Sequence, residues 1–272
     1  MKKRTRIVVG YIFVLFGIFM PLLAFTIMSY REISADREYR SFKEKLPKLT
    51  ESIKSYNDSI KSVNTSIIDP FENEDYIGSY PIEGLDTDEV FAYLIIPKLD
   101  LKKPIYLDAS SKHLNLGVAQ IEGTSLPLGG KSTRSVLAGH RGYWEDFMFY
   151  RVDELEAGDS IFIDGRTGLL KYEVVDKEII NPSEWDKILP IEGKDILTLL
   201  TCHPKRPPRP KRLLINAKRV LEEKETKNSH EKITKEDIKN FNYLKYITYI
   251  ITIIGWIFMV FFIFKLIKFL KA

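Results

Sequence analysis

The chain has almost no sulfur chemistry, because Cys202 is the only cysteine among its 272 residues. A single cysteine excludes an internal disulfide, so the fold does not depend on one. Cys202 closes the uncharged run 196–202, which starts after Asp195 and is followed by the proline-rich segment 204–210. An apolar, β-branched run bounded by prolines predicts a buried strand that ends at the thiol. Most free cysteines are small buried hydrophobic residues, so a reactive role needs a partner group.

Histidine is also scarce, and the charge is nearly balanced. The four histidines form no cluster with the spacing of a metal site, so we expect no metal ion and no other cofactor. The formal net charge is only +4, and the short basic ends of the chain account for most of it. A balanced domain lacks the basic surface that nucleic acids require, so we expect no nucleic-acid partner.

Two long stretches contain no charged residue, namely 7–30 and 246–264. At a rise of 1.5 Å per residue, each is long enough to cross a hydrocarbon layer about 30 Å thick. The first follows a basic start, as the apolar region of a signal peptide would. Its 24 residues exceed the usual length of such a region, however, and no small-residue cleavage site follows cleanly. We therefore expect two membrane helices, the first of them uncleaved.

Basic residues flank both expected membrane helices on the side of the chain ends. They are Lys2, Lys3, Arg4 and Arg6 at the start, and Lys265, Lys268 and Lys271 at the end. The tendency of short basic flanks to stay inside places both ends in the cytoplasm and residues 31–245 outside. An exported domain with one cysteine suits the surface of a Gram-positive cell better than a disulfide-rich secretory scaffold.

The exported part changes character along its length. Apolar residues recur at helical spacing through 31–66, which predicts one or two amphipathic helices with a break near Pro47. From Phe91 onward, short apolar runs alternate with turns, which is typical of a mainly antiparallel β domain closed into a barrel. The Asp164-Gly165 step predicts a hairpin turn, because glycine tolerates a positive φ. The predicted strands are 91–96, 135–138, 160–163, 169–180, 196–201 and 213–220.

After Leu221 the chain is highly charged and poor in apolar residues, which predicts a solvated linker with His230 as a surface residue. No internal repeat is evident in the sequence. The chain therefore divides into a cytoplasmic tail (1–6), a membrane helix (7–30), a helical region outside the membrane (31–78), a β domain (79–221), a charged linker (222–245), a second membrane helix (246–264) and a second tail (265–272).

His140 is the histidine best placed to act with the thiol. It follows the apolar run 135–138, and Gly139 and Gly142 let its ring project from a tight turn. A thiol becomes a useful nucleophile beside an imidazole, and the two need to be adjacent only in space. The alternative is a turn histidine that bonds to the backbone, and this segment alone does not decide between the two.

Three segments, in this order, resemble the sortases, which are membrane-anchored cysteine transpeptidases of Gram-positive bacteria. They are Leu137-Ala-Gly-His-Arg-Gly142, Thr198-Leu-Leu-Thr-Cys202 and Arg212-Leu-Leu-Ile215. Upstream, the segments Ile95-Ile-Pro97, Gly117-Val-Ala119 and Glu122-Gly-Thr-Ser-Leu-Pro127 are also similar to that family's barrel. The resemblance covers about residues 79–221. It implies an eight-stranded, sortase-type β-barrel with short helices, preceded by N-terminal helices and a lid, and flanked by two membrane helices.

Carried over to this sequence, the resemblance implies a role for each residue. Cys202 would attack the Thr–Gly carbonyl of an LPxTG-type sorting signal, His140 would transfer protons, and Arg212 would stabilise the oxyanion or position the substrate. Acyl transfer needs these functions, and a guanidinium stays protonated and offers several donors. With ordinary pKa values of about 8.5 and 6.5, the thiolate–imidazolium pair is a minority state near neutral pH. The residues expected to contact the substrate are Ala138, Leu200 and Thr201.

The loop after the thiol, 203–211, departs from pilus-type relatives, which more often show Thr-Pro-Tyr and an Asn-containing stretch before the arginine. Arg206 and Arg209 are therefore alternatives to Arg212. We favour Arg212 because it opens an apolar strand, whereas the other two lie among prolines and suit a stiff, solvated loop. His203 is an alternative base, but adjacent residues of a strand point to opposite faces.

Asp69-Pro70-Phe71 stands between the helical region and the β domain. It resembles the lid of class C sortases, which assemble pili: an acidic residue pairs with the active-site arginine, and the next aromatic residue covers the thiol. By this resemblance Asp69 would face Arg212, and Phe71 would cover Cys202 until the lid moves. The alternative is an ordinary Asp-Pro helix stop with a packed phenylalanine.

The second membrane helix favours class C, because those enzymes typically carry one at each end. The predicted reaction is pilin polymerisation, in which the threonine of one subunit's sorting signal is joined to a lysine amine of the next pilin. The nearest alternative is a housekeeping sortase that attaches surface proteins to peptidoglycan, since it uses the same three residues with a different amine. The alternative from another class is a membrane-tethered binding module without catalysis, in which Cys202 only packs in the core.

Overall fold

The computed structural model describes residues 3–60, 67–72, 78, 80–142, 148–221 and 242–271. The chain forms two compact units, one made of Met1–Ser41 with Lys232–Ala272 and the other of Phe42–Glu231. The helices are α1 (Lys3–Glu44), α2 (Glu51–Ile60), α3 (Ser111–Leu116) and α5 (Asn242–Lys271), with short 3-10 turns η1 (Pro97–Leu99), η2 (Val152–Glu154) and η3 (Trp185–Ile188). The strands are β1 (Ala92–Ile96), β2 (Leu101–Leu107), β3 (Val118–Gln120), β4 (Thr133–Ala138), β5 (Ser160–Gly165), β6 (Gly168–Ile180), β7 (Asp195–His203) and β8 (Lys211–Arg219). Residues 222–241 of the predicted linker, with His230, lie outside the described residues.

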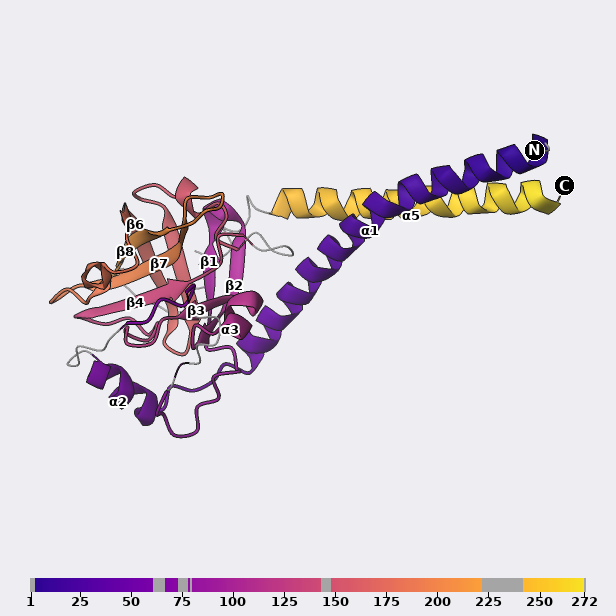
Figure 1. Cartoon of the computed structure of the whole chain (residues 1–272). Helices are drawn as coiled ribbons and strands as arrows, with labels where there is room; N and C mark the ends of the chain where they lie inside the picture. Colours follow the sequence, from indigo (N-terminus) through magenta and orange to yellow (C-terminus); the bar gives the residue numbers. More distant parts are fainter. Residues whose placement is uncertain are drawn as a thin grey trace. The chain divides into compact units, whose positions relative to one another are not determined.

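The unit formed by the chain ends contains most of α1 and all of α5. Its candidate membrane spans are Arg6–Ile27 and Tyr249–Lys271, and both have the length and composition to cross a bilayer. The two helices are joined by a hydrogen bond in which Trp256 Nε1 donates to Thr26 Oγ1 at 3.0 Å. Polar contacts of this kind join apolar helices where water is absent. Figure 1 shows α1 and α5 side by side, with the start of α1 and the end of α5 at the same end of the pair.

Helix α1 is longer than the sequence suggests. We expected the membrane helix to end at Tyr30 and a separate helix to follow, but α1 continues without interruption to Glu44. Residues 31–44 contain neither proline nor glycine, so nothing in the sequence ends the helix there. The predicted break near Pro47 is present, because α1 ends before it and α2 begins at Glu51.

The eight strands form a closed barrel in the order β1-β2-β3-β4-β7-β8-β6-β5 (Figure 1). Neighbouring strands are antiparallel except for two parallel pairs, β2–β3 and β4–β7. The predicted eight-stranded, mainly antiparallel barrel is therefore confirmed. The parallel pair β4–β7 is the one that matters for the functional site.

Two of the strands are not among the predicted runs. β2 contains two lysines and Pro104, and a proline weakens the case for a strand because it cannot donate to a neighbour. β3 has only three residues, which is too short for a periodic pattern. The other six strands fall on the predicted runs, with each end shifted by at most two residues.

The predicted hairpin joins β5 and β6, but the predicted position of its turn is wrong. Gly165 still pairs with Gly168, so the turn residues are Arg166 and Thr167, and the positive φ of 88° belongs to Gly168. Gly165 serves a different purpose, because a Cβ there would lie 2.7 Å from the Cβ of Ala92 on β1. Close packing between strands, not turn geometry, explains that glycine.

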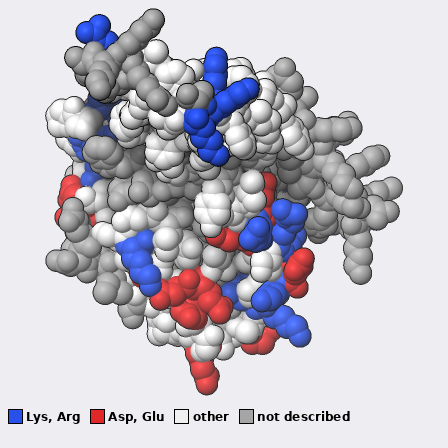
Figure 2. Space-filling model, turned by 90° about the vertical axis from the view of Figure 1, so that its right-hand side faces the viewer, with Lys and Arg blue, Asp and Glu red and all other residues white. Residues whose placement is uncertain are grey.

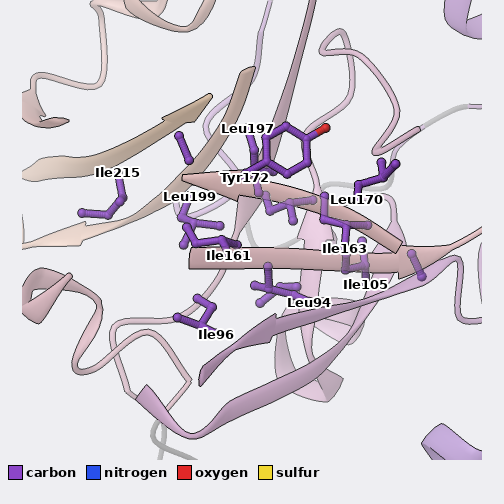
Figure 3. Packing of buried hydrophobic residues seen from close by; sticks show 14 of the residues in the cluster. Leu94, Ile96, Ile105, Ile161, Ile163, Leu170, Tyr172, Leu197, Leu199 and Ile215 are labelled. Atoms are coloured by element: carbon purple, nitrogen blue, oxygen red, sulfur yellow. The ribbon is translucent and has the colours of Figure 1, made fainter. Parts of the chain in front are cut away.

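The strand that carries the thiol is buried on both faces. Leu197 and Leu199 belong to the cluster inside the barrel, which Figure 3 shows with Ile215 of β8. Leu200 belongs to a second cluster on the outer face of the sheet, together with Ala138 of β4. Alternate residues of β7 therefore enter different cores, which explains why the run 196–202 has no charged residue.

Charged side chains of both signs occupy the surface. Across the lower part of the view in Figure 2, Lys and Arg lie among Asp and Glu. Exposed charges more than about 10 Å apart are largely screened at physiological salt, so interspersed charges do not sum to one strong field. Recognition on that face would depend on local groups.

Candidate active site

Two parallel strands bring the predicted histidine and cysteine together. β4 and β7 pair in parallel, with Ala138 opposite Leu200. His140 and Cys202 each follow this pair by two residues, so strand alternation assigns both to the outer face of the sheet. The Gly139 amide extends the register by donating to the Leu200 carbonyl at 3.1 Å. The thiol and the imidazole therefore project from neighbouring strand ends.

Arg212 joins them from the next strand. It lies directly opposite Cys202 in the antiparallel pair β7–β8, where the Cα atoms of facing residues are about 4.5–5.5 Å apart. Its side chain is only 3% exposed, and its Nε donates to Asp69 Oδ2 at 2.8 Å. Its Nη2 lies 2.8 Å from the same oxygen, and its Nη1 donates to the carbonyls of Arg209 and Lys211. The buried guanidinium is thus both charge-paired and hydrogen-bonded, as burial requires.

The turn that carries His140 is fixed from two sides. A Cβ at Gly139 would lie 2.8 Å from the ring of Phe149, so this position leaves room only for glycine. The Phe149 amide donates to the His140 carbonyl at 3.0 Å. The Thr201 hydroxyl donates to the Gly139 carbonyl at 2.7 Å. These bonds hold the histidine turn against β7.

Asp69-Pro70-Phe71 lies against the site. Asp69 Oδ1 accepts a hydrogen bond from the Phe71 amide at 2.9 Å, a local turn that leaves Oδ2 free for Arg212. The centroid of the Phe71 ring is 5.5 Å from Arg212 Cζ and 5.9 Å from the centroid of the His140 ring. Phe71 also packs against the outer hydrophobic cluster. One short segment therefore contacts both the guanidinium and the imidazole.

Burial and neighbouring charges favour the neutral forms of the reactive pair. Burial raises the pKa of the Cys202 thiol, Arg212 opposes that rise, and the Asp69 carboxylate adds to it. Burial also lowers the pKa of His140, and the positive charge of Arg209 lowers it further. A thiol pKa above its usual value and an imidazole pKa below it leave both groups uncharged near pH 7.

Comparison with known proteins identifies the family to which this chain belongs. The sortase domain family matches residues 94–220, which contain the three predicted catalytic residues. Sortase C-3 from Streptococcus pneumoniae is 42% identical with a TM-score of 0.58, over 62% of this chain and 80% of that structure. The chain belongs to the sortase family.

Two further relatives show which sortases it resembles. Sortase C1 of the pilus island 1 of Group B Streptococcus is 34% identical with a TM-score of 0.57, over 65% of this chain and 83% of that structure. Sortase D from Bacillus subtilis (strain 168) is 31% identical over 137 residues, which is 50% of this chain and 66% of that protein. Since both solved structures are sortases C, this sortase is most like the class C enzymes.

The residues expected to touch the substrate occupy two different faces of the sortase barrel. Ala138 and Leu200 are fully buried in the outer cluster, on the face that carries the thiol and under the residues of the lid motif. Thr201 belongs to the other face of β7, is 1% exposed, and has its hydroxyl bonded to the Gly139 carbonyl. Its geometry fits the support of the histidine turn, whereas Ala138 and Leu200 belong to the cluster against which Phe71 packs.

The alternative residues from the loop after the thiol also have defined places. Arg206 is exposed, as expected for a solvated loop. Arg209 is not: it is partly buried, its Nη2 donates to the Lys205 carbonyl at 2.9 Å, and its charge lowers the pKa of the imidazole. Arg209 lies close to the site because its backbone carbonyl accepts a hydrogen bond from Arg212 Nη1. His203 follows the thiol on β7, so strand alternation directs it to the opposite face.

Positive charge near the thiol comes from three arginines. Arg212, Arg209 and Arg141 all lower the pKa of the thiol against the effect of burial. Sequence reasoning did not single out Arg141, which is 1% exposed and has its Nη2 3.0 Å from Asp153 Oδ1. Guanidinium groups of this kind can stabilise a developing oxyanion. In the part of the chain that the structure describes, no group of three or more His, Cys, Asp or Glu side chains is placed to hold a metal ion.

Sequence reasoning also missed Asn115. It lies on α3, and its Oδ1 is 3.2 Å from His140 Nε2. A neutral imidazole that donates from Nε2 to this oxygen has its ring orientation and its tautomer fixed. The only signal in the sequence was its position just before the Gly117-Val-Ala119 segment. Nothing in that position indicated a contact with a histidine 25 residues further along the chain.

Replacing Asn115 with alanine is expected to lower kcat/KM for a sorting-signal peptide about three- to tenfold, because one net hydrogen bond is worth about 0.5–1.5 kcal/mol. Asn115→Asp is the matched variant, since its carboxylate keeps the acceptor and raises the pKa of the imidazole. The acid limb of its pH–rate profile should move to higher pH. Wild-type activity and an unshifted profile in both variants would show that the bond has no role in turnover.

Proposed function

We propose that this sortase polymerises pilins. The donor is the LPxTG-type sorting signal of one pilin, and the acceptor is a lysine amine of another. The observation that carries the proposal is the lid: Asp69 is ion-paired with the buried Arg212, and Phe71 lies against the same guanidinium. The proposal is also supported by a candidate membrane helix near each end of the chain and by the likeness to a sortase from a pilus island.

The first half-reaction transfers the acyl group to the enzyme. The thiolate of Cys202 attacks the carbonyl carbon of the threonine in the Thr–Gly bond, and the carbonyl electron pair moves onto the oxygen. Arg212 donates hydrogen bonds to that oxyanion. As the pair returns, the carbon–nitrogen bond breaks and the imidazolium of His140 gives its proton to the leaving glycine amine. A thioacyl enzyme and a free glycine-bearing peptide result.

The second half-reaction transfers the acyl group to the next subunit. The lysine amine attacks the thioester carbonyl, and the neutral imidazole of His140 takes the proton that the amine loses. The carbon–sulfur bond breaks, Cys202 leaves as a thiolate, and an isopeptide bond joins the two pilins. The proton given up in the first half is recovered in the second, so the catalytic pair returns to its starting state.

The location of the enzyme follows from the same proposal. Both chain ends lie in the cytoplasm, because short basic flanks beside an apolar span stay inside. The barrel then acts on the outer face of the membrane of a Gram-positive bacterium. Exported pilins with an uncleaved sorting signal would meet the thiol there.

The proposal is tested with the full chain in detergent micelles and a purified pilin that carries its sorting signal. The expected product is a ladder of covalent multimers that survives boiling in detergent. Replacing the acceptor lysine in the pilin should remove the ladder while cleavage continues. Cleavage without any multimer from the unaltered pilin would contradict polymerisation, and transfer only to a cross-bridge peptide would favour peptidoglycan anchoring.

Replacing Asp69 with alanine is expected to raise the rate at which iodoacetamide alkylates Cys202 at pH 7 roughly tenfold. Arg212 loses its carboxylate partner, so the lid is no longer held over the site. The lost negative charge also lowers the pKa of the thiol, and a lower pKa means more thiolate at a fixed pH. The measurement is the pseudo-first-order alkylation rate followed by mass spectrometry.

Glu72→Ala is the matched control for the lid variant. The Glu72 carboxylate lies 3.5 Å from the same guanidinium, but its side chain is 62% exposed. An exposed ion pair contributes little, so the alkylation rate should stay within about twofold of wild type. Equal rates for wild type and Asp69→Ala would mean that residues 69–71 do not close the site.

A further inference from the structure

A cavity of about 830 Å³ lies at the opposite end of β7 from the thiol. It is lined by the starts of β4 and β7 and by the end of β8. Asp195 opens β7 and Cys202 is its eighth residue, so a rise of about 3.3 Å per residue separates them by about 23 Å. The cavity is therefore distinct from the active site, and its volume is typical of ligand sites.

One wall of the cavity lies on the face of the sheet that carries the active site, whereas Leu170 and Ala217 of its lining belong to the cluster inside the barrel. Ile196 lines the cavity, and strand alternation puts it on the same face of β7 as Cys202. The loop that contains η3 crosses this face between them, and its Ile188 packs in the outer cluster with Leu200. Arg134 of β4 holds the loop in place by donating to the Lys187 and Leu189 carbonyls. A substrate that contacts both sites must therefore pass over this loop, which a whole pilin is large enough to do.

A bulge in β6 shapes the cavity wall. Val174 pairs with Ala217 and packs inside the barrel, whereas Asp176 pairs with Asn216 on the outer face. Val175 has no partner in β8, so two consecutive side chains, Val175 and Asp176, turn toward the cavity. Bulges that re-aim side chains are common beside functional sites.

The acidic groups of the cavity already have partners. Asp195 accepts a hydrogen bond from the Tyr172 hydroxyl at 3.0 Å and from the Gly130 amide at 2.8 Å. Figure 3 shows the Tyr172 hydroxyl pointing away from the middle of the barrel core. Asp176 accepts from Asn216 Nδ2 at 2.7 Å. Both carboxylates therefore already accept hydrogen bonds from groups within the protein.

Three lysines on the rim of the cavity, by contrast, have no partner among the described residues. Lys131, Lys194 and Lys218 line the cavity, and all three are exposed. None of the three ammonium groups forms an ion pair or hydrogen bond with any other residue that the structure describes. Beside them, Ile191 is 40% exposed and Leu221 is 78% exposed. Among the described residues, the cavity therefore offers positive charge without a partner next to apolar surface.

We propose that this cavity binds an acidic segment of the pilin substrate, one that carries an apolar side chain between its carboxylates. This inference rests on the proposed function and adds a second contact to it. The three lysines pair with the carboxylates, and the apolar side chain covers the exposed wall. Binding two sites on one substrate raises its effective concentration at the thiol. Opposite charges also speed the encounter, more so at low salt.

The test compares a whole pilin with a short peptide that carries the same sorting signal, using the full chain in micelles. The variant Lys194→Glu/Lys218→Glu should lower the ratio of kcat/KM for pilin to kcat/KM for peptide at least tenfold, through a higher KM for pilin. The matched control is Lys45→Glu/Lys48→Glu, which reverses two exposed lysines outside the cavity and should leave the ratio unchanged. An equal ratio in the cavity variant and in wild type overturns the inference.

A binding arm separates this inference from the proposed function. The Kd of the whole pilin is measured by interferometry with Cys202→Ala and with Cys202→Ala carrying the two cavity substitutions. If no sortase variant cleaves the pilin, the proposed function fails, and the inference stands only if the cavity substitutions still raise the Kd at least tenfold. An unchanged Kd overturns it.

Other occupants are distinguished in the same experiment. The cavity variant is also compared with wild type in nanodiscs. If its substitutions weaken pilin binding in phosphatidylglycerol but not in phosphatidylcholine, the cavity binds lipid headgroups, which overturns the inference. The variant Glu222→Gln/Glu223→Gln alters the acidic residues that follow Leu221. If that change tightens pilin binding while the lysine reversals have no effect, the chain's own linker is the occupant, which also overturns it.

Discussion

Replacing Cys202 with alanine is expected to lower kcat/KM for a fluorogenic LPxTG-type peptide by at least about 10⁴-fold. The reaction passes through a thioacyl intermediate, and the chain has no second cysteine to form one. The same variant should give no multimers with a whole pilin. Initial rates at several peptide concentrations measure the effect, and mass spectrometry should find the acyl adduct only on the wild type.

His203→Ala is the matched control for the loss of the thiol. It alters the next residue of β7, whose side chain is directed to the opposite face of the strand. Its kcat/KM should stay within about threefold of wild type, and both variants should unfold within about 3 °C of it. Equal peptide signals from wild type and Cys202→Ala would favour a binding module that does not catalyse.

Replacing Arg212 with lysine is expected to lower kcat for the same peptide about 10²–10³-fold with little change in KM. Lysine keeps the positive charge, so the buried Asp69 carboxylate retains a partner and residues 69–71 are disturbed as little as possible. It lacks the planar fork of donors that a guanidinium presents to an oxyanion. Steady-state kinetics with the peptide separates kcat from KM.

Arg209→Lys and Arg206→Lys test the two alternative arginines. Arg209 lowers the pKa of the imidazole from the edge of the site, so its replacement should cost less than about fivefold. Arg206 is exposed, and its replacement should have no measurable effect. A larger loss of kcat in Arg209→Lys than in Arg212→Lys would transfer the oxyanion role to Arg209.

The parts of the site that depend on local sequence pattern could be predicted from the sequence. The uncharged run 196–202 predicts a strand because it is buried on both faces, and the glycines around His140 predict a turn. Asp69 and Arg212 could be paired only through resemblance to a family, since they are 143 residues apart and no local rule connects them. The structure brings them to 2.8 Å.

The parts that could not be predicted depend on contacts between distant segments. β2 carries lysines and a proline, and it is a strand only because β1 and β3 lie beside it. Asn115 meets His140 because α3 leads into β3, which pairs with β4. Gly165 looks like a turn residue, yet a glycine is needed there because Ala92 of another strand approaches closely. Each feature appears only after the barrel closes.

The parallel pairing of β4 with β7 also determines when the thiol becomes reactive. Cys202 and His140 are 62 residues apart in the sequence and meet only through that pairing, because no local segment joins them. Non-local parallel strands pair slowly, since the chain must close a long loop before it gains any stabilising contact. A chain that is still unfolded therefore carries an ordinary cysteine. Its nucleophile is assembled only when the barrel is complete, so the rate at which activity appears after refolding reports the closure of the sheet.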